Sequence, residues 1–172
     1  MPPGWRSAGT WSIVRAMDAV LLLAALCEIE RTLVGSLVRG VAAASPHGLW
    51  VDLATSRGPE GLLLSAEAAL PRIVRGALQP AKTRPLPPLA GVARRRLPGA
   101  RLTGIVHHGL DRVAHLDFAP ALVTAPEGVQ TGSGCRLILE LFGSQPNLLL
   151  TDAEGSILEA ARHAPPSAGR PQ

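Results

Sequence analysis

The pair of residues with the clearest chemical potential is Asp111-Arg112, within the segment Gly109-Leu110-Asp111-Arg112-Val113. An apolar run ends just before this pair and an alternating run, Val113 to Phe118, begins just after it, so both charged side chains are expected at the start of a strand. The planar guanidinium of Arg112 can donate to a phosphate or to a base edge. Asp111 can fix that guanidinium or accept from a ribose hydroxyl or a base amino group. The alternative is a surface ion pair worth less than about 1 kcal/mol.

A run of three cations lies upstream of this pair, at Arg94, Arg95 and Arg96. The chain of 172 residues has a net charge of +4 and a pI of about 10.4, and Lys82 is its only lysine. An arginine excess of this kind is typical of proteins that bind RNA or DNA. Two alternatives account for the arginines without a nucleic acid. Cations near the end of a helix favour its macrodipole, and a high-GC genome encodes arginine in place of lysine.

Motifs for enzyme chemistry are absent from the sequence. There is no GxxxxGK[ST] phosphate loop and no GxSxG motif, and the Gly-rich stretch Thr131 to Cys135 lacks the lysine and the strand-to-helix context. His107 and His108 are adjacent, so in a strand they point to opposite faces and do not easily share a metal. Cys27 and Cys135 lie in no metal-ligand spacing and suggest no disulfide framework. We therefore expect no catalytic residue, no metal, no cofactor and no enzyme activity, and a reduced, cytoplasmic compartment.

An amphipathic helix is predicted from about Asp18 to Val34, with Asp18 as its N-cap and Gly35 as its stop. Its apolar positions follow helical spacing through charged residues; they are Leu22, Leu26, Ile29 and Leu33. The run Ala19 to Cys27 alone also resembles the core of a signal peptide. The acidic residues on both sides of that run argue against export, and its length is too short to span a bilayer.

Most of the remaining sequence predicts short strands. We expect them at residues 37–43, 49–53, 62–64, 102–107, 113–118, 136–142, 147–151 and 156–160. Between them, Gly58 to Gly61 is expected to be a turn, Ala77 to Leu89 a Pro-rich crossing, Ala90 to Leu97 a short basic helix, and Pro120 to Gly134 a loop. Strands at this spacing, with helices at an edge or an end, predict an α+β domain built on an antiparallel β-sandwich or open barrel.

The two ends of the sequence differ from the rest. Residues 1–16 and 165–172 are small, polar and marked by Pro and Gly, without a hydrophobic period. Both segments are expected to be disordered, and residues 1–16 are interpreted as an extension upstream of a natural start at Met17. One folded domain is predicted over residues 17–164.

From Met17 onward the chain resembles the N-terminal domain of the NFACT family. This family comprises bacterial ribosome-quality-control factors of the RqcH type, formerly described as fibronectin-binding-protein-A-like, and eukaryotic NEMF. The matching pieces occur in order over about residues 17–164, and their order and spacing carry the resemblance. They are Met17-Asp18 with the Leu-rich helix, Val34-Gly35, Val38 to Val41, Leu62 to Ala66, Leu70 to Ile73, Arg94 to Leu102, Gly109 to Val113, Leu139 to Gly143 and Asn147 to Leu150.

The resemblance implies both a fold and a function. The fold would be similar to the N-terminal domain of formamidopyrimidine-DNA glycosylases, a β-sandwich with flanking helices, but Met17-Asp18 does not reproduce their N-terminal nucleophile. The function would be binding to a large ribosomal subunit that holds a stalled peptidyl-tRNA, with recruitment of tRNA for C-terminal alanine tailing. Asp111 and Arg112 match the Asp-Arg pair that this tRNA-dependent step requires. The implied tRNA-binding set is Asp111, Arg112, Arg94, Arg95, Arg96 and Asn147.

Two departures from the family leave alternatives open. Ser144-Gln145-Pro146-Asn147 stands where members usually place Arg and His before Ser-Asn. Members also continue into a helix-hairpin-helix region, a coiled coil and a C-terminal RNA-binding domain. We therefore expect a fragment, a split protein whose other domains are encoded separately, or a degenerate paralogue. The rival functions are a surface-associated fibronectin-binding adhesin and a structural paralogue without RNA binding.

Overall fold

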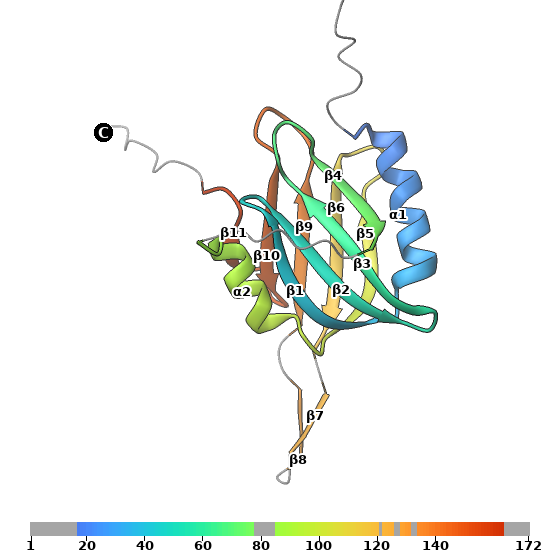
Figure 1. Cartoon of the computed structure of the whole chain (residues 1–172), viewed down its shortest axis with the longest axis vertical. Coiled ribbons are helices and arrows are strands. Elements are labelled where there is room, and N and C mark those ends of the chain that lie inside the picture. The colour runs from blue at the N-terminus through green and yellow to red at the C-terminus, as the bar shows by residue number, and fades with distance from the viewer. Residues whose placement is uncertain (1–16, 78–84, 121, 126–127, 132–133, 164–172) are drawn as a thin grey trace, which may run out of the picture.

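The computed structural model describes residues 17–77, 85–120, 122–125, 128–131 and 134–163, which form two helices and two antiparallel sheets (Figure 1). The predicted disorder of residues 1–16 and 165–172 concerns segments outside the described residues. In chain order the elements are α1 (Ala19–Leu33), β1 (Leu37–Ser45), β2 (Gly48–Thr55), β3 (Gly58–Ser65), β4 (Arg72–Gly76), α2 (Pro88–Arg96), β5 (Arg101–His107), β6 (Val113–Ala119), β7 (Leu122–Ala125), β8 (Gly128–Thr131), β9 (Cys135–Glu140), β10 (Asn147–Asp152) and β11 (Ile157–Ala160).

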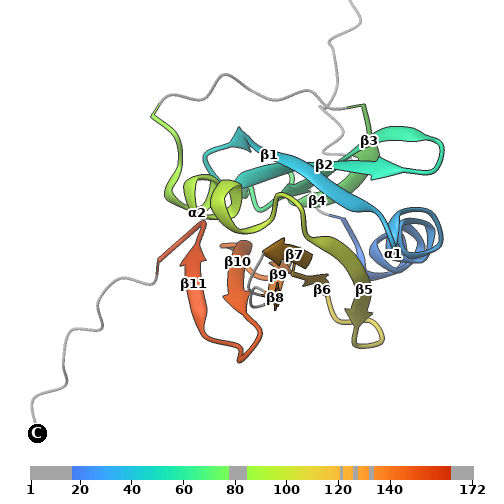
Figure 2. The same cartoon turned by 90° about the horizontal axis from the view of Figure 1, so that it is seen from below.

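The large sheet folds back into two layers at the contact between β1 and β5. Its nine strands have the order β11-β10-β9-β6-β5-β1-β2-β3-β4. At the junction, the strand ladder consists of the single pair Leu37 and Arg101, whereas β1 pairs with β2 over most of its length. Figure 2 shows β1 to β4 in one layer and β5, β6, β9, β10 and β11 in the other. This arrangement confirms the predicted α+β fold with an antiparallel sandwich.

The core lies between the two layers and consists almost entirely of aliphatic side chains. In β6 the buried residues Ala114, Leu116 and Phe118 alternate with half-buried ones, as expected for a strand with one face on a core. The same alternation occurs in β2, where Leu49, Val51 and Leu53 are buried. In each layer, therefore, the apolar residues at every second position of a strand form the face that is turned to the core.

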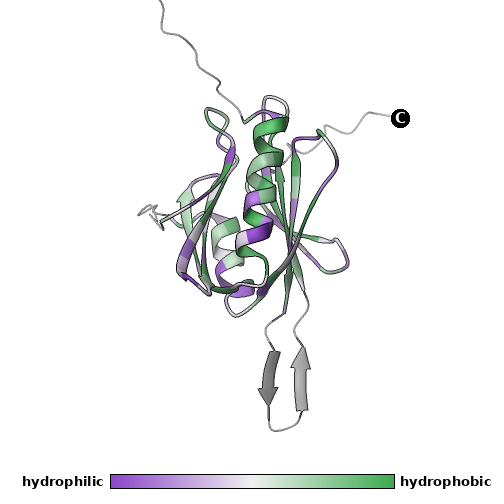
Figure 3. Ribbon diagram, turned by 90° about the vertical axis from the view of Figure 1, so that its right-hand side faces the viewer, coloured by the Kyte–Doolittle hydropathy of each residue, from purple (hydrophilic) through white to green (hydrophobic). Residues whose placement is uncertain are grey.

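Helix α1 covers the side of the sandwich between β4 and β5 (Figure 2). Its buried residues are those that the helical spacing predicts: Leu22, Leu26, Ile29 and Leu33. The Asp18 side chain accepts a hydrogen bond from the Leu21 amide at 2.8 Å, and Gly35 follows the helix with a φ of 91°. In Figure 3 the hydrophilic residues of α1 gather in its last turns, where Arg75 of β4 reaches Glu28 at 3.1 Å. The predicted cap, face and stop of this helix are confirmed.

Helix α2 covers the opposite side, between β1 and β11, and buries Leu89, Ala90 and Ala93. It begins at Pro88, two residues earlier than predicted, because proline fits the first helical position, where its missing N–H costs nothing. Neither helix of the described chain has the length and apolarity needed to cross a bilayer.

Three sequence-based expectations were wrong. Gly58 to Gly61 is the start of β3, paired with β2 from Thr55 onward, so the turn occupies the two residues before it. Strand β4 was not expected, because Arg72 to Gly76 is short and only Ile73 is fully buried. The stretch Pro120 to Gly134 contains the β7–β8 hairpin instead of an irregular loop. In each case the strand is formed by pairing with a neighbouring strand. Its sequence does not show the alternation of apolar and polar residues by which strands are predicted.

Arg162 joins the two layers at the end of the sandwich opposite β7 and β8. Its guanidinium donates to the carbonyl of Pro146, in the β9–β10 loop, at 3.1 Å, and to the carbonyl of Ala66, in the β3–β4 loop, at 3.3 Å. Its backbone amide donates to the side-chain oxygen of Asn147 at 3.0 Å. One side chain therefore satisfies carbonyl groups from both layers.

We expect Asp18→Ala to lower the free energy of unfolding by about 1 kcal/mol, because the Leu21 amide loses its acceptor at the helix start. Urea denaturation followed by circular dichroism measures the change. Asp18→Asn is the matched control, since asparagine caps as well as aspartate. Equal destabilisation by both substitutions would contradict the capping role.

We expect Arg162→Ala to lower the free energy of unfolding by roughly 1 to 2 kcal/mol, because hydrogen bonds from a charged donor to carbonyls of both loops are lost. Thermal and urea unfolding measure the effect. The control is Arg57→Ala in the β2–β3 turn, where the arginine is exposed and a change within about 0.5 kcal/mol is expected. An Arg162→Ala protein as stable as the control would show that the two loops do not depend on this contact.

Candidate nucleic-acid interface

The Asp111-Arg112 pair lies in the tight connection between β5 and β6. The connection begins after His107 and turns at Gly109, which has a φ of 56°, a conformation that glycine adopts readily. The Asp111 amide donates to the His108 carbonyl at 3.0 Å and closes the turn. The Leu141 amide donates to the Arg112 carbonyl at 2.7 Å. The backbone of Arg112 is thus held by the end of the neighbouring strand β9, at one end of the sandwich as predicted.

The side chains of this connection surround an open hollow of about 480 Å³, lined by Leu110, Asp111, Arg112, Val113 and Phe142. We call it the loop hollow. Leu110 is 67% exposed and Phe142 is 47% exposed, so both present apolar surface beside the charged pair. An exposed aromatic ring next to an arginine is an arrangement on which bases stack in single-stranded nucleic-acid sites.

Phe142 was not among the candidate residues from the sequence. The signal that could have found it is weak: it is one of two phenylalanines in a chain with 3% aromatic residues. It also lies directly after the buried Leu141, at the point where β9 has ended. Only the pairing of β6 with β9, with Val113 opposite Glu140, brings Phe142 beside Arg112.

Asp111 and Arg112 form no ion pair with each other or with any other described residue within 4.0 Å. From the sequence we expect Asp111 to hold the Arg112 guanidinium, or the two to form a surface ion pair. Neither contact is present in the structure. Asp111 is exposed and Arg112 is half-buried. Two unneutralised charges of opposite sign therefore face the hollow, one a donor of hydrogen bonds and the other an acceptor.

Arg94, Arg95 and Arg96 lie at the other end of the sandwich. They are exposed in the last turn of α2, which leads to Arg101 opposite Ala119, the last residue of β6. Arg96 also lies near Cys135, the first residue of β9, at this same end. Burial raises the pKa of the Cys135 thiol, and the positive charge of Arg96 opposes this rise. Since β6 spans seven residues, the two arginine groups are separated by roughly 20 Å along the strand. The structure does not bring the arginine run to the loop hollow.

Asn147 lies at the same end of the sandwich as Arg112. It pairs with Glu140 of β9, which in turn pairs with Val113 of β6, the residue after Arg112. Its side-chain oxygen accepts from the amides of Leu148 at 2.9 Å and Arg162 at 3.0 Å. Its amide nitrogen donates to the Arg162 carbonyl at 3.1 Å. The side chain of Asn147 is therefore largely occupied in holding β11 against β10.

The outer face of β6 continues from the loop hollow through His115 and Asp117. The rings of His108 and His115 meet edge to face at 5.9 Å. Burial, followed by the charges of Arg136 and His108, lowers the pKa of His115, which favours its neutral form. Asp117 accepts two hydrogen bonds from Arg136, at 2.5 and 3.2 Å. Among the described residues, no group of three His, Cys, Asp or Glu side chains could hold a metal ion.

Solved structures with this fold include fibronectin- and fibrinogen-binding proteins of bacteria. The N-terminal domain of the fibronectin-binding protein PavA from Streptococcus pneumoniae superposes with a TM-score of 0.77 at 23% identity, over 90% of this chain and 59% of that one. The N-terminal part of the fibronectin/fibrinogen-binding protein from Streptococcus suis gives 0.76 at 22% identity, over 88% and 55%. The fibrinogen-binding protein from Staphylococcus aureus gives 0.70 at 24% identity, over 87% and 52%.

These likenesses establish a shared fold, and this chain spans little more than half the length of each of the three structures. No curated protein matches the chain in sequence. The family of NFACT N-terminal and middle domains matches residues 18–171, nearly the whole chain. By this match, the chain belongs to the NFACT family.

Proposed function

We propose that this chain binds RNA through the loop hollow, and that its RNA partner is tRNA at a stalled large ribosomal subunit. The observation that carries the proposal is the Arg112 guanidinium, which faces an open hollow beside an exposed aromatic ring and has no carboxylate partner among the described residues. Membership of the NFACT family supports an RNA or ribosome partner.

Each side chain of the hollow has a separate role in this proposal. Arg112 donates in parallel to a phosphate or to a base edge. Phe142 and Leu110 supply an apolar surface on which an unpaired base stacks. Asp111 accepts from a ribose 2′-hydroxyl or a base amino group, a contact that favours RNA over DNA. The hydrogen bond from Leu141 to the Arg112 carbonyl keeps these groups in register.

The second cationic group, Arg94 to Arg96, serves as a separate phosphate contact. Its distance of roughly 20 Å along the strand direction means that only a large folded RNA reaches both ends of the domain. In this proposal the chain binds and positions tRNA in the cytoplasm and performs no catalytic step itself. Alanine tailing itself would depend on the ribosome.

A second candidate function is binding to fibronectin. The observation that favours it is the set of similar structures, because two of the three are described as fibronectin-binding proteins. In that case the exposed apolar residues of the loop hollow would contact protein instead of bases. Immobilised fibronectin, titrated with wild-type chain and with Phe142→Ser, tests this candidate. Saturable binding that Phe142→Ser weakens, without any tRNA binding, would replace the RNA proposal.

We expect Arg112→Ala to weaken tRNA binding by roughly 5- to 150-fold, the effect of losing one specific arginine contact of about 1 to 3 kcal/mol. Filter binding at fixed low salt measures the affinity, and the melting temperature checks the fold. Arg57→Ala is the matched control, because it removes an exposed arginine at the opposite end of the sandwich. Unchanged affinity in a folded Arg112→Ala protein would refute the assignment.

We also expect tRNA affinity to fall steeply with salt. With about two to four phosphate contacts, the slope of log K against log salt should lie between roughly −1.4 and −2.8, at −0.7 per contact on single strands. Replacing Arg94, Arg95 and Arg96 by Gln should make the slope shallower by up to about 2. A slope that the triple substitution leaves unchanged would remove these arginines from the interface.

A further inference from the structure

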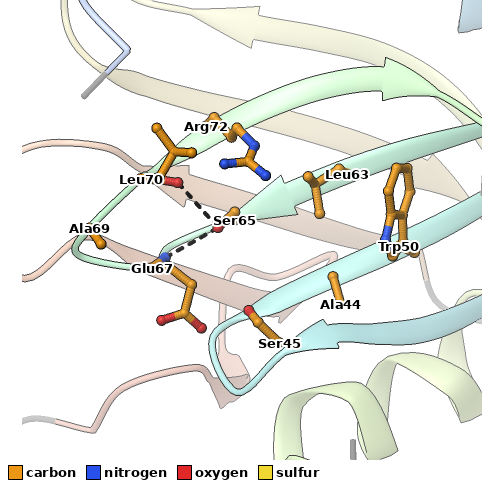
Figure 4. A pocket seen from close by; sticks show the side chains of 9 residues that line it. All are labelled: Ala44, Ser45, Trp50, Leu63, Ser65, Glu67, Ala69, Leu70 and Arg72. Atoms are coloured by element: carbon orange, nitrogen blue, oxygen red, sulfur yellow. Dashed lines mark hydrogen bonds between the residues drawn. The ribbon is translucent and has the colours of Figure 1, made fainter. Parts of the chain in front are cut away.

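A second pocket lies on the outer face of the other layer, formed by β1 to β4 (Figure 4). Its volume is about 350 Å³, and it is lined by Trp50, Leu63, Leu70, Arg72 and Glu67, together with small residues of β1 and the β3–β4 loop. We call it the Trp50 pocket. It is separate from the loop hollow, which is formed by the β5–β6 connection, the first residue of β6 and the β9–β10 loop.

Strand pairing places the main side chains of the pocket on one face. Trp50 of β2 lies opposite Leu63 of β3, and Ser65 of β3 lies opposite Arg72 of β4. Residues 63 and 65 point to the same side of their strand. The indole and the guanidinium are therefore two strands apart, about 10 Å across the sheet, with Leu63 between them. Figure 4 shows both side chains on this face.

Glu67 is held at the wall of the pocket in its charged form. One carboxylate oxygen accepts from the His47 amide at 3.0 Å, and the other lies 3.2 Å from the His47 ring nitrogen. Burial acts to raise the pKa of Glu67, but the Ser45 hydroxyl and His47 outweigh it, so the pKa lies below its usual value. In Figure 4 the carboxylate points away from Arg72 and toward Ser45.

Arg72 differs from Arg39 and Arg75, the other arginines on the strands of this layer. Arg39 is paired with Asp52 at 3.7 Å, and Arg75 is paired with Glu28 and Glu60. Arg72 forms no ion pair with a described residue within 4.0 Å. A half-buried guanidinium without a carboxylate, beside an aromatic and apolar wall, is an anion-binding group placed next to a stacking surface.

We propose that the Trp50 pocket binds one unpaired nucleotide of an RNA strand, with its base against Trp50 and Leu63 and its phosphate on Arg72. This inference rests on the proposed RNA-binding function and adds a second, independent contact to it. The volume fits a single base, and the chain carries a net charge of +4 that favours a polyanion. The carboxylate of Glu67 lies within the lining as an acceptor for a base amino group or a ribose hydroxyl.

The position of the pocket supports a continuous path for RNA. The β3–β4 loop, which carries Glu67 and Leu70, is joined through Arg162 to the β9–β10 loop, which carries Phe142. Figure 1 shows both loops at the same end of the domain. A strand that leaves the loop hollow therefore meets the Trp50 pocket by passing around this end.

An extended peptide fits the pocket less well. A peptide that adds to a sheet needs a free strand edge, and β4, the edge strand of this layer, lies against α1 with Arg75 bonded to Glu28. The pocket lies on the face of the sheet, where a flat ring stacks but no backbone ladder forms. A nucleotide uses this face through its base and its phosphate.

Fluorescence of Trp50 tests the proposal directly. The chain has three tryptophans, Trp5, Trp11 and Trp50, so Trp5→Phe with Trp11→Phe leaves Trp50 as the only reporter. We expect a single-stranded RNA hexamer to quench its emission saturably, and an abasic hexamer of the same charge to quench it weakly. Arg72→Gln should weaken the hexamer affinity about fivefold or more, while Arg39→Gln, which breaks a paired arginine on the same layer, should leave it unchanged.

The outcomes separate this inference from the proposed function. Hexamer quenching that persists in Arg112→Ala, while tRNA affinity falls, supports two independent contacts. Binding of tRNA without any quenching by the hexamer overturns the Trp50 pocket and leaves the RNA function standing. Equal quenching by the abasic hexamer overturns base stacking. A blue shift produced by an apolar hexapeptide, with no response to RNA, assigns the pocket to a peptide and overturns the proposal.

Discussion

The structure depends on the burial of two leucine-rich sheet faces against each other. With 3% aromatic residues, the interior holds Phe118 as its aromatic ring among the described residues, and the core is built mainly from Leu, Ile, Val and Ala side chains of both layers and both helices. Both faces belong to one side of the same nine-stranded sheet, so a flat sheet would leave that side in water. Folding the sheet back at β1 and β5 buries both, and α1 and α2 then close the two open sides.

This closure determines where functional groups can lie. The faces inside the sandwich are apolar, so the polar and charged side chains are confined to the loops at its ends and to the outer faces. The pairing of β6 with β9 brings the β5–β6 connection beside the β9–β10 loop, and Arg162 joins the β9–β10 loop to the β3–β4 loop. The loop hollow and the Trp50 pocket are consequences of this arrangement.

The arginines divide into those that serve the fold and those that remain available. Arg39, Arg75 and Arg136 are paired with carboxylates on the sheet surfaces, and Arg162 bonds to backbone carbonyls. Arg72, Arg112 and the run Arg94 to Arg96 have no carboxylate within 4.0 Å in the described part of the chain. The basic composition alone could not make this distinction, because it depends on which residues lie opposite one another.

The sequence by itself determined the features that depend on local periodicity. The buried face of α1, its Asp18 cap, the stop at Gly35 and the alternation in β6 were all predicted, because caps and side-chain direction follow from residues within one or two turns. The placement of Asp111 and Arg112 at a strand start, and so at one end of the sandwich, followed from the same reasoning.

Only the tertiary structure decided which distant residues meet. Strand β4 and the β7–β8 hairpin are formed by pairing with a neighbouring strand. Their short sequences mix polar and apolar residues without a regular alternation that would predict a strand. The register of β6 with β9 brings Phe142 to Arg112, and the order of β2, β3 and β4 brings Arg72 toward Trp50. The pairing of β5 with β6 places Arg94 to Arg96, at the end of α2, at the opposite end of the sandwich from Arg112. Residue spacing along the chain does not encode these distances, because they are set by how the sheet folds back on itself.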